Sequence, residues 1–132
     1  MAIIGNIGGS RAYHITPEGI FQISRDHSVV ENMVAKGDLT PLEARTHPNR
    51  NLITRALGPD IHAKADTFEL PWHKDEFLLL CSDGLVNTVS DQEMLFEVLH
   101  DGDIESCLDH LMQISLRRGA PDNVTVVLLM NT

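Results

Sequence analysis

Two aspartates stand beside apolar segments, at positions where a strand would end or begin. Asp83 closely follows the apolar run 77–81, and Asp122 precedes the apolar run 124–130. A continuous apolar run of this length is typical of a strand buried on both faces. If these strands are antiparallel neighbours, the end of the first meets the start of the second. The sequence therefore predicts that Asp83 and Asp122 lie at the same edge of a sheet.

A pair of neighbouring carboxylates favours a site for a divalent cation. Two carboxylates repel each other unless a positive charge lies between them, and ligation by oxygen alone favours Mg²⁺ or Mn²⁺. Gly84, directly after Asp83, would let the backbone turn sharply. A simpler interpretation is also open, because Asp-Gly and Pro-Asp-Asn are ordinary turn sequences. Spacing alone does not decide between a metal site and two turns.

The elements expected around these aspartates mix strands and helices without a regular β-α-β alternation. Thr40 and Ser90 each begin a capping box, and Asp103 is a third helix-capping residue. A Thr-Pro-Glu-Gly turn joins two β-prone runs into a hairpin. This order predicts the α+β class. The expected strands are 12–15, 19–24, 67–70, 77–81 and 124–130, and the expected helices are 29–36, 41–45, 91–99 and 104 up to Gly119.

Composition limits the possible classes of function. The chain has 132 residues, enough for one domain, with a formal net charge of −9 and no basic block. A nucleic-acid-binding surface is therefore not expected, and the acidity fits either hard-cation binding or an ordinary soluble surface. No apolar run approaches the roughly 18 residues of a membrane span, and no signal peptide is recognised. Two cysteines without a CxxC pair indicate a reducing, cytoplasmic environment.

Other side chains that could do chemistry are expected to have structural roles. The seven histidines show no HxxxH or HxH spacing, so we predict no zinc site and expect these residues at exposed or turn positions. Cys81 is expected in the core rather than as a nucleophile. Arg11 and Arg55 could approach a phosphate, but salt bridging is their expected role. Trp72 is expected to pack against the core.

Several motifs occur together in an order typical of one enzyme family. The string SDGL after an apolar strand is followed further along by APDNVTVVLL, and NIGGSRAY and ISRDHSVVENMVAKGDLTPLEARTHPNRNLITRALG precede both. These motifs in this order resemble the metal-dependent protein serine/threonine phosphatases of the PP2C (PPM) family. The middle stretch looks like the bacterial branch, whose members dephosphorylate targets of Ser/Thr kinases. The resemblance covers nearly the whole chain.

This resemblance implies a fold, a metal centre and a reaction. The implied fold is a sandwich of antiparallel sheets flanked by helices, with two Mn²⁺ or Mg²⁺ ions at one end. A water activated by these ions attacks the phosphorus of phosphoserine or phosphothreonine. Asp83 and Asp122 match two metal-binding aspartates of the family, and Asn123 and Gly84 match their supporting neighbours. The segment 28–58, which contains Val29, Val34, Thr40 and Arg45, would be a substrate-selecting flap.

The sequence departs from the family pattern in two ways. Family members are longer at the N-terminus, where an Asp-Gly-x-Gly-Gly motif supplies an aspartate that bridges both metals and an arginine binds phosphate. Residues 1–132 are therefore expected to form a single partial domain, the C-terminal part of the phosphatase domain. The family also reads Gly-Asp-Ser-Arg where this chain reads Gly8-Gly9-Ser10-Arg11. Gly9 thus replaces a carboxylate that helps to hold a third metal in the family.

Three functional hypotheses follow from these features. The first is a phosphatase that acts on phosphorylated proteins, among them targets of a Ser/Thr kinase and the kinase itself. The second is a non-catalytic module with a degraded metal site that binds phosphoproteins or a kinase. The third is an incomplete domain that self-associates through exposed sheet edges. Catalytic groups beyond the metal ligands are not expected, and neither nucleic acid nor membrane is an expected partner.

Overall fold

Two antiparallel sheets and a pair of long helices form three layers. The computed structural model describes residues 1–56, 58, 64–120 and 122–132. The four-stranded sheet has the order β3-β2-β5-β6, and β1 and β4 form a separate two-stranded sheet. The elements are β1 (Ala2–Asn6), β2 (Arg11–Thr16), β3 (Gly19–Gln22), α1 (Val29–Ala35), α2 (Pro41–Thr46), β4 (Asp66–Leu70), β5 (Phe77–Cys81), α3 (Asp83–Val86), α4 (Asp91–His100), α5 (Ile104–Arg117) and β6 (Val126–Met130).

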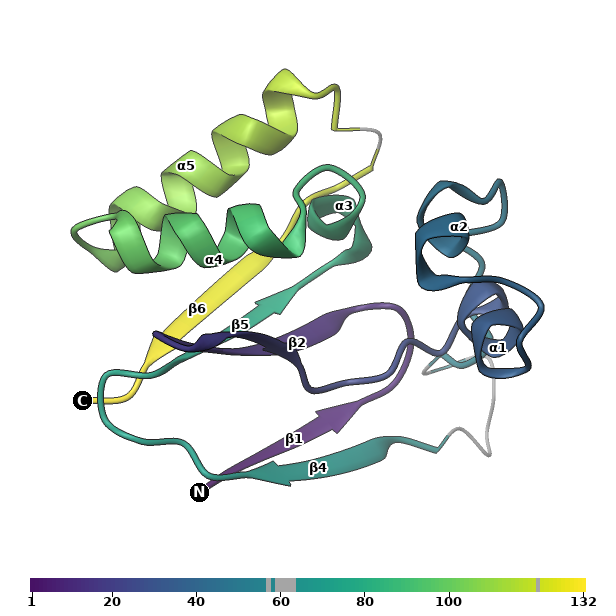
Figure 1. Cartoon of the computed structure of the whole chain (residues 1–132), viewed down its shortest axis with the longest axis horizontal. Helices are drawn as coiled ribbons and strands as arrows, with labels where there is room; N and C mark the ends of the chain where they lie inside the picture. Colours follow the sequence, from purple (N-terminus) through teal and green to yellow (C-terminus); the bar gives the residue numbers. More distant parts are fainter. Residues whose placement is uncertain (57, 59–63, 121) are drawn as a thin grey trace.

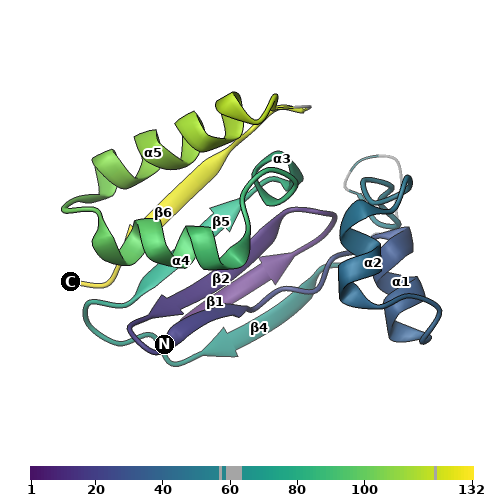
Figure 2. The same cartoon turned by 45° about the horizontal axis from the view of Figure 1, so that its top comes forward.

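The layers confirm the expected α+β sandwich. Helices α4 and α5 cover one face of the four-stranded sheet, and the β1–β4 sheet lies on the other side (Figures 1 and 2). The short helices α1 and α2 lie together at the end of the sheets away from both chain termini (Figure 1). No helix in the described part of the chain is long and apolar enough to cross a membrane.

Alternation along β5 explains why the layers stack on both of its faces. Successive side chains of a strand point to opposite faces. Leu79 and Cys81 belong to the core beneath the helices, together with Leu111 of α5. Leu78 points the other way and packs with Leu70 in the cluster beneath β1 and β4. A strand that is apolar on both faces can therefore hold two layers at once, as its continuous apolar sequence predicts.

The capping boxes predicted from the sequence are both present. The Thr40 hydroxyl accepts the Glu43 N–H at 3.1 Å, and the Glu43 carboxylate accepts the Thr40 N–H at 2.9 Å. Ser90 and Glu93 make the same reciprocal pair at 3.2 and 3.0 Å. Asp103 caps α5 by accepting the Ser106 N–H at 2.8 Å. Each such cap stabilises its helix start by about 1 kcal/mol.

Two elements were not predicted. Strand β1 pairs with β4, from Ala2 opposite Leu70 to Asn6 opposite Asp66, and its partner is far away in the sequence. Helix α3 has four residues and begins at Asp83, where the sequence suggested only a turn. Both elements are too short to show a periodicity of their own. The predicted start of the last strand at 124 is also early, since β6 begins at Val126.

The structural roles expected for single residues are largely confirmed. Arg55 Nη1 lies 3.1 Å from Asp66 Oδ1. Trp72 packs beside the cluster beneath β1 and β4 and donates its Nε1 hydrogen to the Glu76 carbonyl at 3.1 Å. Cys81 is buried and free, and burial raises the pKa of its thiol to about 12, so it remains protonated and unreactive.

The expectation that every histidine lies at an exposed or turn position is wrong for His27. Its side chain is buried. Nδ1 accepts the Gly8 N–H at 3.0 Å, so Nε2 carries the hydrogen and lies 2.7 Å from Asp66 Oδ2. Of the other sequence expectations, His62, residue 57 of the flap and Pro121 lie outside the described residues.

Candidate functional site

A cavity of about 510 Å³ opens where the ends of the strands meet α1, α2 and α3. Segments that are far apart in the sequence line it together. They include the turn before β2, the loop after β3, helices α1 and α2, the start of α3 and the start of α4. The charged lining residues are Arg11, Asp26, Glu31, Arg45, Arg50, Asp83 and Asp91. The cavity therefore contains both carboxylates and guanidinium groups, beside apolar side chains of α1 and α2 such as Val34 and Leu42.

Pairing of β5 with β6 places Asp83 and Asp122 at the same edge of the sheet, as the sequence predicts. Cys81, the last residue of β5, lies opposite Val126, the first residue of β6. The hydrogen bonding continues one residue beyond this pair, where the Ser82 N–H donates to the Thr125 carbonyl at 3.0 Å. Asp83 and Asp122 come from the two loops that continue past this last pair.

Ser82 ties these two loops together. Its hydroxyl accepts the Thr125 N–H at 3.0 Å and donates to the Asn123 carbonyl at 3.3 Å. Ser82 also precedes the first residue of α3, Asp83. The serine therefore fixes the distance between the two acidic loops through main-chain atoms, without using either carboxylate.

Gly84 is required by a close approach rather than by a sharp turn. It lies within α3, outside the set of glycines with positive φ. A Cβ at this position would collide with the carbonyl oxygen of Asn123 and lie 3.3 Å from Val124 Cγ2. Only glycine therefore lets α3 lie directly against the loop that carries Asp122.

The environment of Asp83 disfavours the charged form of its carboxyl group. Burial and the nearby charge of Asp122 raise the pKa of the Asp83 carboxyl above its ordinary value, and hydrogen bonds from main-chain N–H groups oppose this shift. Asp122 is exposed and accepts the N–H of Asn123 at 2.7 Å. The contacts that the structure gives Asn123 are made by its main chain. The two carboxylates thus repel each other, and an oxygen-preferring cation bound between them would relieve that repulsion.

Arg11 is held in place by an ion pair with Asp26 and by a hydrogen bond to Tyr13. Its Nε and Nη2 lie 2.9 and 2.7 Å from the two oxygens of Asp26, and its Nη1 lies 2.9 Å from the Tyr13 hydroxyl. That hydroxyl donates to Asp91 at 3.1 Å. Burial would lower the pKa of Arg11, but the bonds to Asp26 and the nearby Tyr13 raise it well above its usual range. The salt-bridging role predicted for Arg11 is confirmed.

The predicted flap reaches the cavity with part of its residues. Val34 of α1 and Arg45 of α2 line it, whereas Val29 and Thr40 stand at the helix starts, outside the described lining. Arg45 Nη2 also donates to the Val89 carbonyl at 3.3 Å. Asn51 accepts a hydrogen bond from Asn87 after α3 at 2.8 Å. The flap is therefore connected to the body next to the acidic edge.

Gly9 lines the same cavity. A Cβ built at Gly9 would lie 3.2 Å from Ile53 Cγ2, which is close but involves the end of a half-exposed side chain. Its backbone lies outside the positive-φ region. The position can therefore accept a side chain if Ile53 moves by a few tenths of an ångström.

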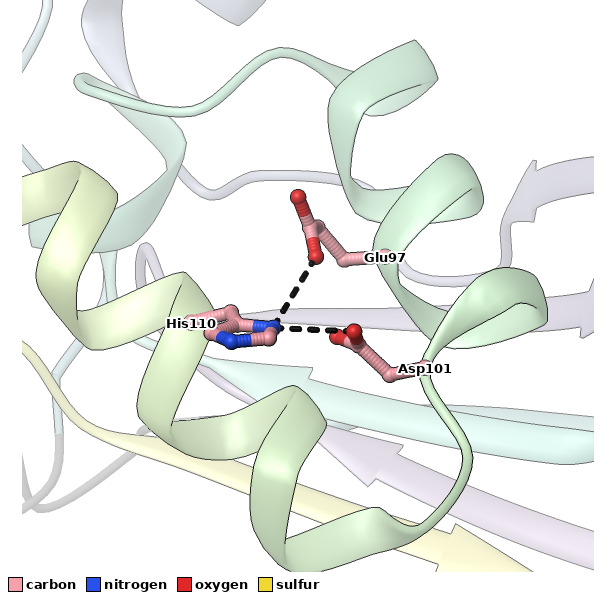
Figure 3. Close-up of side chains that lie close together, drawn as sticks. All are labelled: Glu97, Asp101 and His110. Atoms are coloured by element: carbon pink, nitrogen blue, oxygen red, sulfur yellow. Dashed lines mark hydrogen bonds and ion pairs between the residues drawn. The ribbon is translucent and has the colours of Figure 1, made fainter.

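Sequence reasoning missed a second group of ligating side chains. Glu97, Asp101 and His110 come together between α4 and α5, outside the cavity (Figure 3). The expectation of no zinc site rested on spacing between histidines, and a group with a single histidine leaves no such signal. The spacing of Glu97 and Asp101, four residues apart at the end of a helix, is the one trace of it in the sequence.

The comparisons with known proteins agree with this geometry. No family model matches the chain. The serine/threonine phosphatase stp of Listeria monocytogenes is 34% identical over 127 residues, which is 96% of this chain and 50% of that protein. The phosphatase PstP of Mycobacterium tuberculosis is 40% identical over 123 residues, 92% of this chain and 23% of that protein. The chain thus spans half or less of the length of these relatives.

Solved structures give the same result. Stp1 of Staphylococcus aureus superposes with a TM-score of 0.91 at 42% identity, over 98% of this chain and 51% of that one. The chain belongs to the PP2C (PPM) family of serine/threonine phosphatases. It corresponds to the C-terminal half of relatives such as the Listeria phosphatase stp. The catalytic domain of PstP in complex with two manganese ions matches with a TM-score of 0.79 at 35% identity, over 96% of this chain and 51% of that one.

Proposed function

We propose that this chain forms the C-terminal half of a metal-dependent phosphatase that hydrolyses phosphoserine and phosphothreonine in proteins. The meeting of Asp83 and Asp122 at one sheet edge, beside a cavity lined by charged side chains, carries the proposal. The phosphatase names of the relatives agree with it. Its substrates would be cytoplasmic targets of a Ser/Thr kinase and the kinase itself.

The donor set at this edge fits Mn²⁺ or Mg²⁺. Asp83 and Asp122 offer carboxylate oxygens only, and such ligands suit hard divalent cations. When bound, two such ions would lower the pKa of a water and neutralise charge on the phosphoryl group. The part of this chain is to hold the two carboxylates at a fixed spacing through Ser82 and Gly84. Arg11, already paired with Asp26, would shape the cavity rather than bind phosphate.

The flap would select the substrate. Val34 and Arg45 line the cavity beside Asp83, so a phosphorylated peptide in this cavity would lie against α1 and α2. Arg45 adds positive charge to the lining of the cavity, and phosphoproteins carry the complementary charge. Substrate preference is therefore expected to change with flap residues while metal binding does not.

The test is Mn²⁺-dependent hydrolysis of a phosphothreonine peptide. We would assay this chain alone and mixed with the N-terminal half of a relative such as Stp1, and prepare Asp83→Asn as the control in both. We expect no activity above the Asp83→Asn background for the chain alone, because two aspartates are few ligands for these ions. The mixture should gain activity that both a chelator and Asp83→Asn abolish.

Gly9 supports a second candidate, a non-catalytic module that binds phosphoproteins or a kinase. It places no ligand atom at a cavity position where the family has a carboxylate. Binding of a phosphopeptide without metal, unchanged in Asp83→Asn and weakened in Arg45→Ala, would favour this alternative. In that case the mixture with the N-terminal half would stay inactive.

Self-association is a third expectation with structural support. The edge strand β6 exposes Val127, Leu129 and Met130, and β1 exposes Ile3. An edge strand with exposed apolar side chains is a surface on which further strands can pair. Size-exclusion chromatography of the chain at several concentrations tests whether a second copy occupies it.

A further inference from the structure

Helices α4 and α5 bring three metal-ligating side chains together at the end of α4 remote from the cavity. Glu97 lies in α4, Asp101 directly follows α4, and His110 lies in α5. One ligand atom from each lies within 4.8 Å of the other two. Asp91, which lines the cavity, stands at the opposite end of α4, roughly 15 Å away at 1.5 Å per residue. The cluster is therefore separate from the Asp83 edge.

Both carboxylates of the cluster lie close to the same nitrogen of His110. His110 Nδ1 lies 2.8 Å from Asp101 Oδ1 and 3.5 Å from Glu97 Oε2 (Figure 3). Both carboxylates point toward the same ring nitrogen rather than into solvent, and their side chains are only 19% and 14% exposed. His110 is about half exposed, which leaves a route from solvent to the cluster.

One oxygen of the cluster lacks the partner that its burial requires. Asp101 Oδ2 is buried and has no hydrogen-bond partner among the described residues. Buried polar atoms are nearly always satisfied, and a buried carboxylate oxygen without a donor is strongly unfavourable. A cation at this point would satisfy it, and His110, already bonded to Oδ1, cannot reach every lone pair of both carboxylates.

Electrostatics favour the same conclusion. Burial and the adjacent Asp101 raise the pKa of Glu97, and His110 opposes that shift only in part. Two carboxyl groups are therefore crowded around a single imidazole. A divalent ion between them would relieve the repulsion of the two ionised carboxylates.

We propose that Glu97, Asp101 and His110 bind a first-row divalent transition-metal ion, with Zn²⁺ as the test ion. Two carboxylate oxygens and one imidazole nitrogen form a mixed donor set that suits such ions better than Mg²⁺ or Ca²⁺. Three protein ligands with an open fourth position are a common arrangement for zinc. The ion would cross-link α4 to α5, and its binding does not depend on phosphatase activity.

The test is calorimetric titration of Zn²⁺ into the full chain. Asp83→Asn and Asp122→Asn are introduced first, so that ions at the Asp83 edge do not contribute. We expect one equivalent of Zn²⁺ to bind this double variant. Adding His110→Ala should weaken binding at least about tenfold, since loss of even an indirect supporting partner has that effect at metal sites. Asp109→Asn, an exposed neighbour of His110, is the matched control and should change nothing.

A second measurement needs no substitution in the cluster. The imidazole nitrogen resonances of His110, recorded by NMR with and without Zn²⁺, should show a large shift at Nδ1 and a smaller one at Nε2. Equal zinc affinity in His110→Ala and Asp109→Asn would overturn the proposal. So would unchanged His110 resonances at saturating Zn²⁺, and the cluster would then be a simple ion pair between two helices.

Discussion

The chain contains two crowded pairs of carboxylates that are positioned by different means. Asp83 and Asp122 are placed by main-chain contacts, since Gly84 and Ser82 hold the two loops against each other. Glu97 and Asp101 are placed by side chains, because both meet the ring of His110 on the neighbouring helix. In both pairs, burial and a neighbouring aspartate raise the pKa of one member.

This difference determines which changes should disrupt each pair. The loop pair should be sensitive to added atoms near the backbone and tolerant of changes to distant side chains. The helix pair should keep its backbone when a ligand is substituted, because α4 and α5 are held by the core beneath them. One substitution near each pair can therefore test how that pair is positioned.

The largest effect is expected for Gly84→Ala. Its methyl group would overlap the Asn123 carbonyl oxygen, and the obstacle is backbone rather than a mobile side chain. We expect a loss of about 3 kcal/mol in the free energy of unfolding, at the upper end for overpacking. Urea denaturation measures it. Gly102→Ala is the matched control, because nothing lies within 4 Å of a Cβ at Gly102. Equal losses in both variants would contradict the close approach of α3 to the Asn123 loop.

The same difference explains how much of each pair could be predicted from the sequence. Asp83 and Asp122 adjoin strands that can be recognised from their apolar runs. The single assumption that these strands are antiparallel neighbours placed both aspartates at one edge. Glu97 and His110 lie on helices whose starts were predicted, but their meeting depends on how α4 and α5 cross. That crossing is set by core packing and by the turn at Asp103, and helix periodicity alone does not contain it.

Close contacts between segments that are distant in the sequence could not be predicted either. The Asp-Gly pair suggested a turn, whereas the structure uses Gly84 to let a helix touch a carbonyl group. The burial of His27 depends on Gly8 and Asp66, which come from distant segments. Local patterns therefore predicted most of the elements, though not β1 or α3, and one pair of site residues; contacts across the fold supplied the rest.

Glu93, a carboxylate outside both pairs, shows how a full set of hydrogen bonds and an ion pair change the pKa of a carboxyl group. It lies at the start of α4, where bonds from Arg118 and the Ser90 N–H lower its pKa to about 2. A carboxyl with a lowered folded-state pKa stabilises the fold above its unfolded value, near 4.5, and that stabilisation disappears as pH falls toward 2. The shift is opposite to that of Glu97 on the same helix.

We therefore expect Glu93→Gln to reduce stability at neutral pH and to make no difference near pH 2. The loss at pH 7 should be about 1 kcal/mol, because solvent screens this partly exposed pair. Urea denaturation at a series of pH values between 7 and 2 measures it. Glu105→Gln, an exposed glutamate in the first turn of α5, is the control. A difference that persists unchanged to pH 2 would argue against the ion pair with Arg118.

The smallest structural effect is expected for Gly9→Asp, which adds a third carboxylate near the loop pair. The new Cβ needs only a small shift of the half-exposed Ile53 side chain, so stability should fall by less than about 1 kcal/mol. If Gly9 replaces a metal-binding carboxylate, the variant should gain more thermal stability from added Mn²⁺ than the natural chain does. Binding to the folded state alone produces such a gain.

Gly9→Asn separates charge from shape at this position. Asparagine has nearly the same volume as aspartate and meets Ile53 in the same way, but it brings no negative charge. We expect both variants to lose the same small amount of stability without metal and only Gly9→Asp to respond more strongly to Mn²⁺. Thermal unfolding with and without Mn²⁺ measures both effects. Equal responses would mean that this cavity position does not face a cation, and that the acidic edge formed by Asp83 and Asp122 ends short of Gly9.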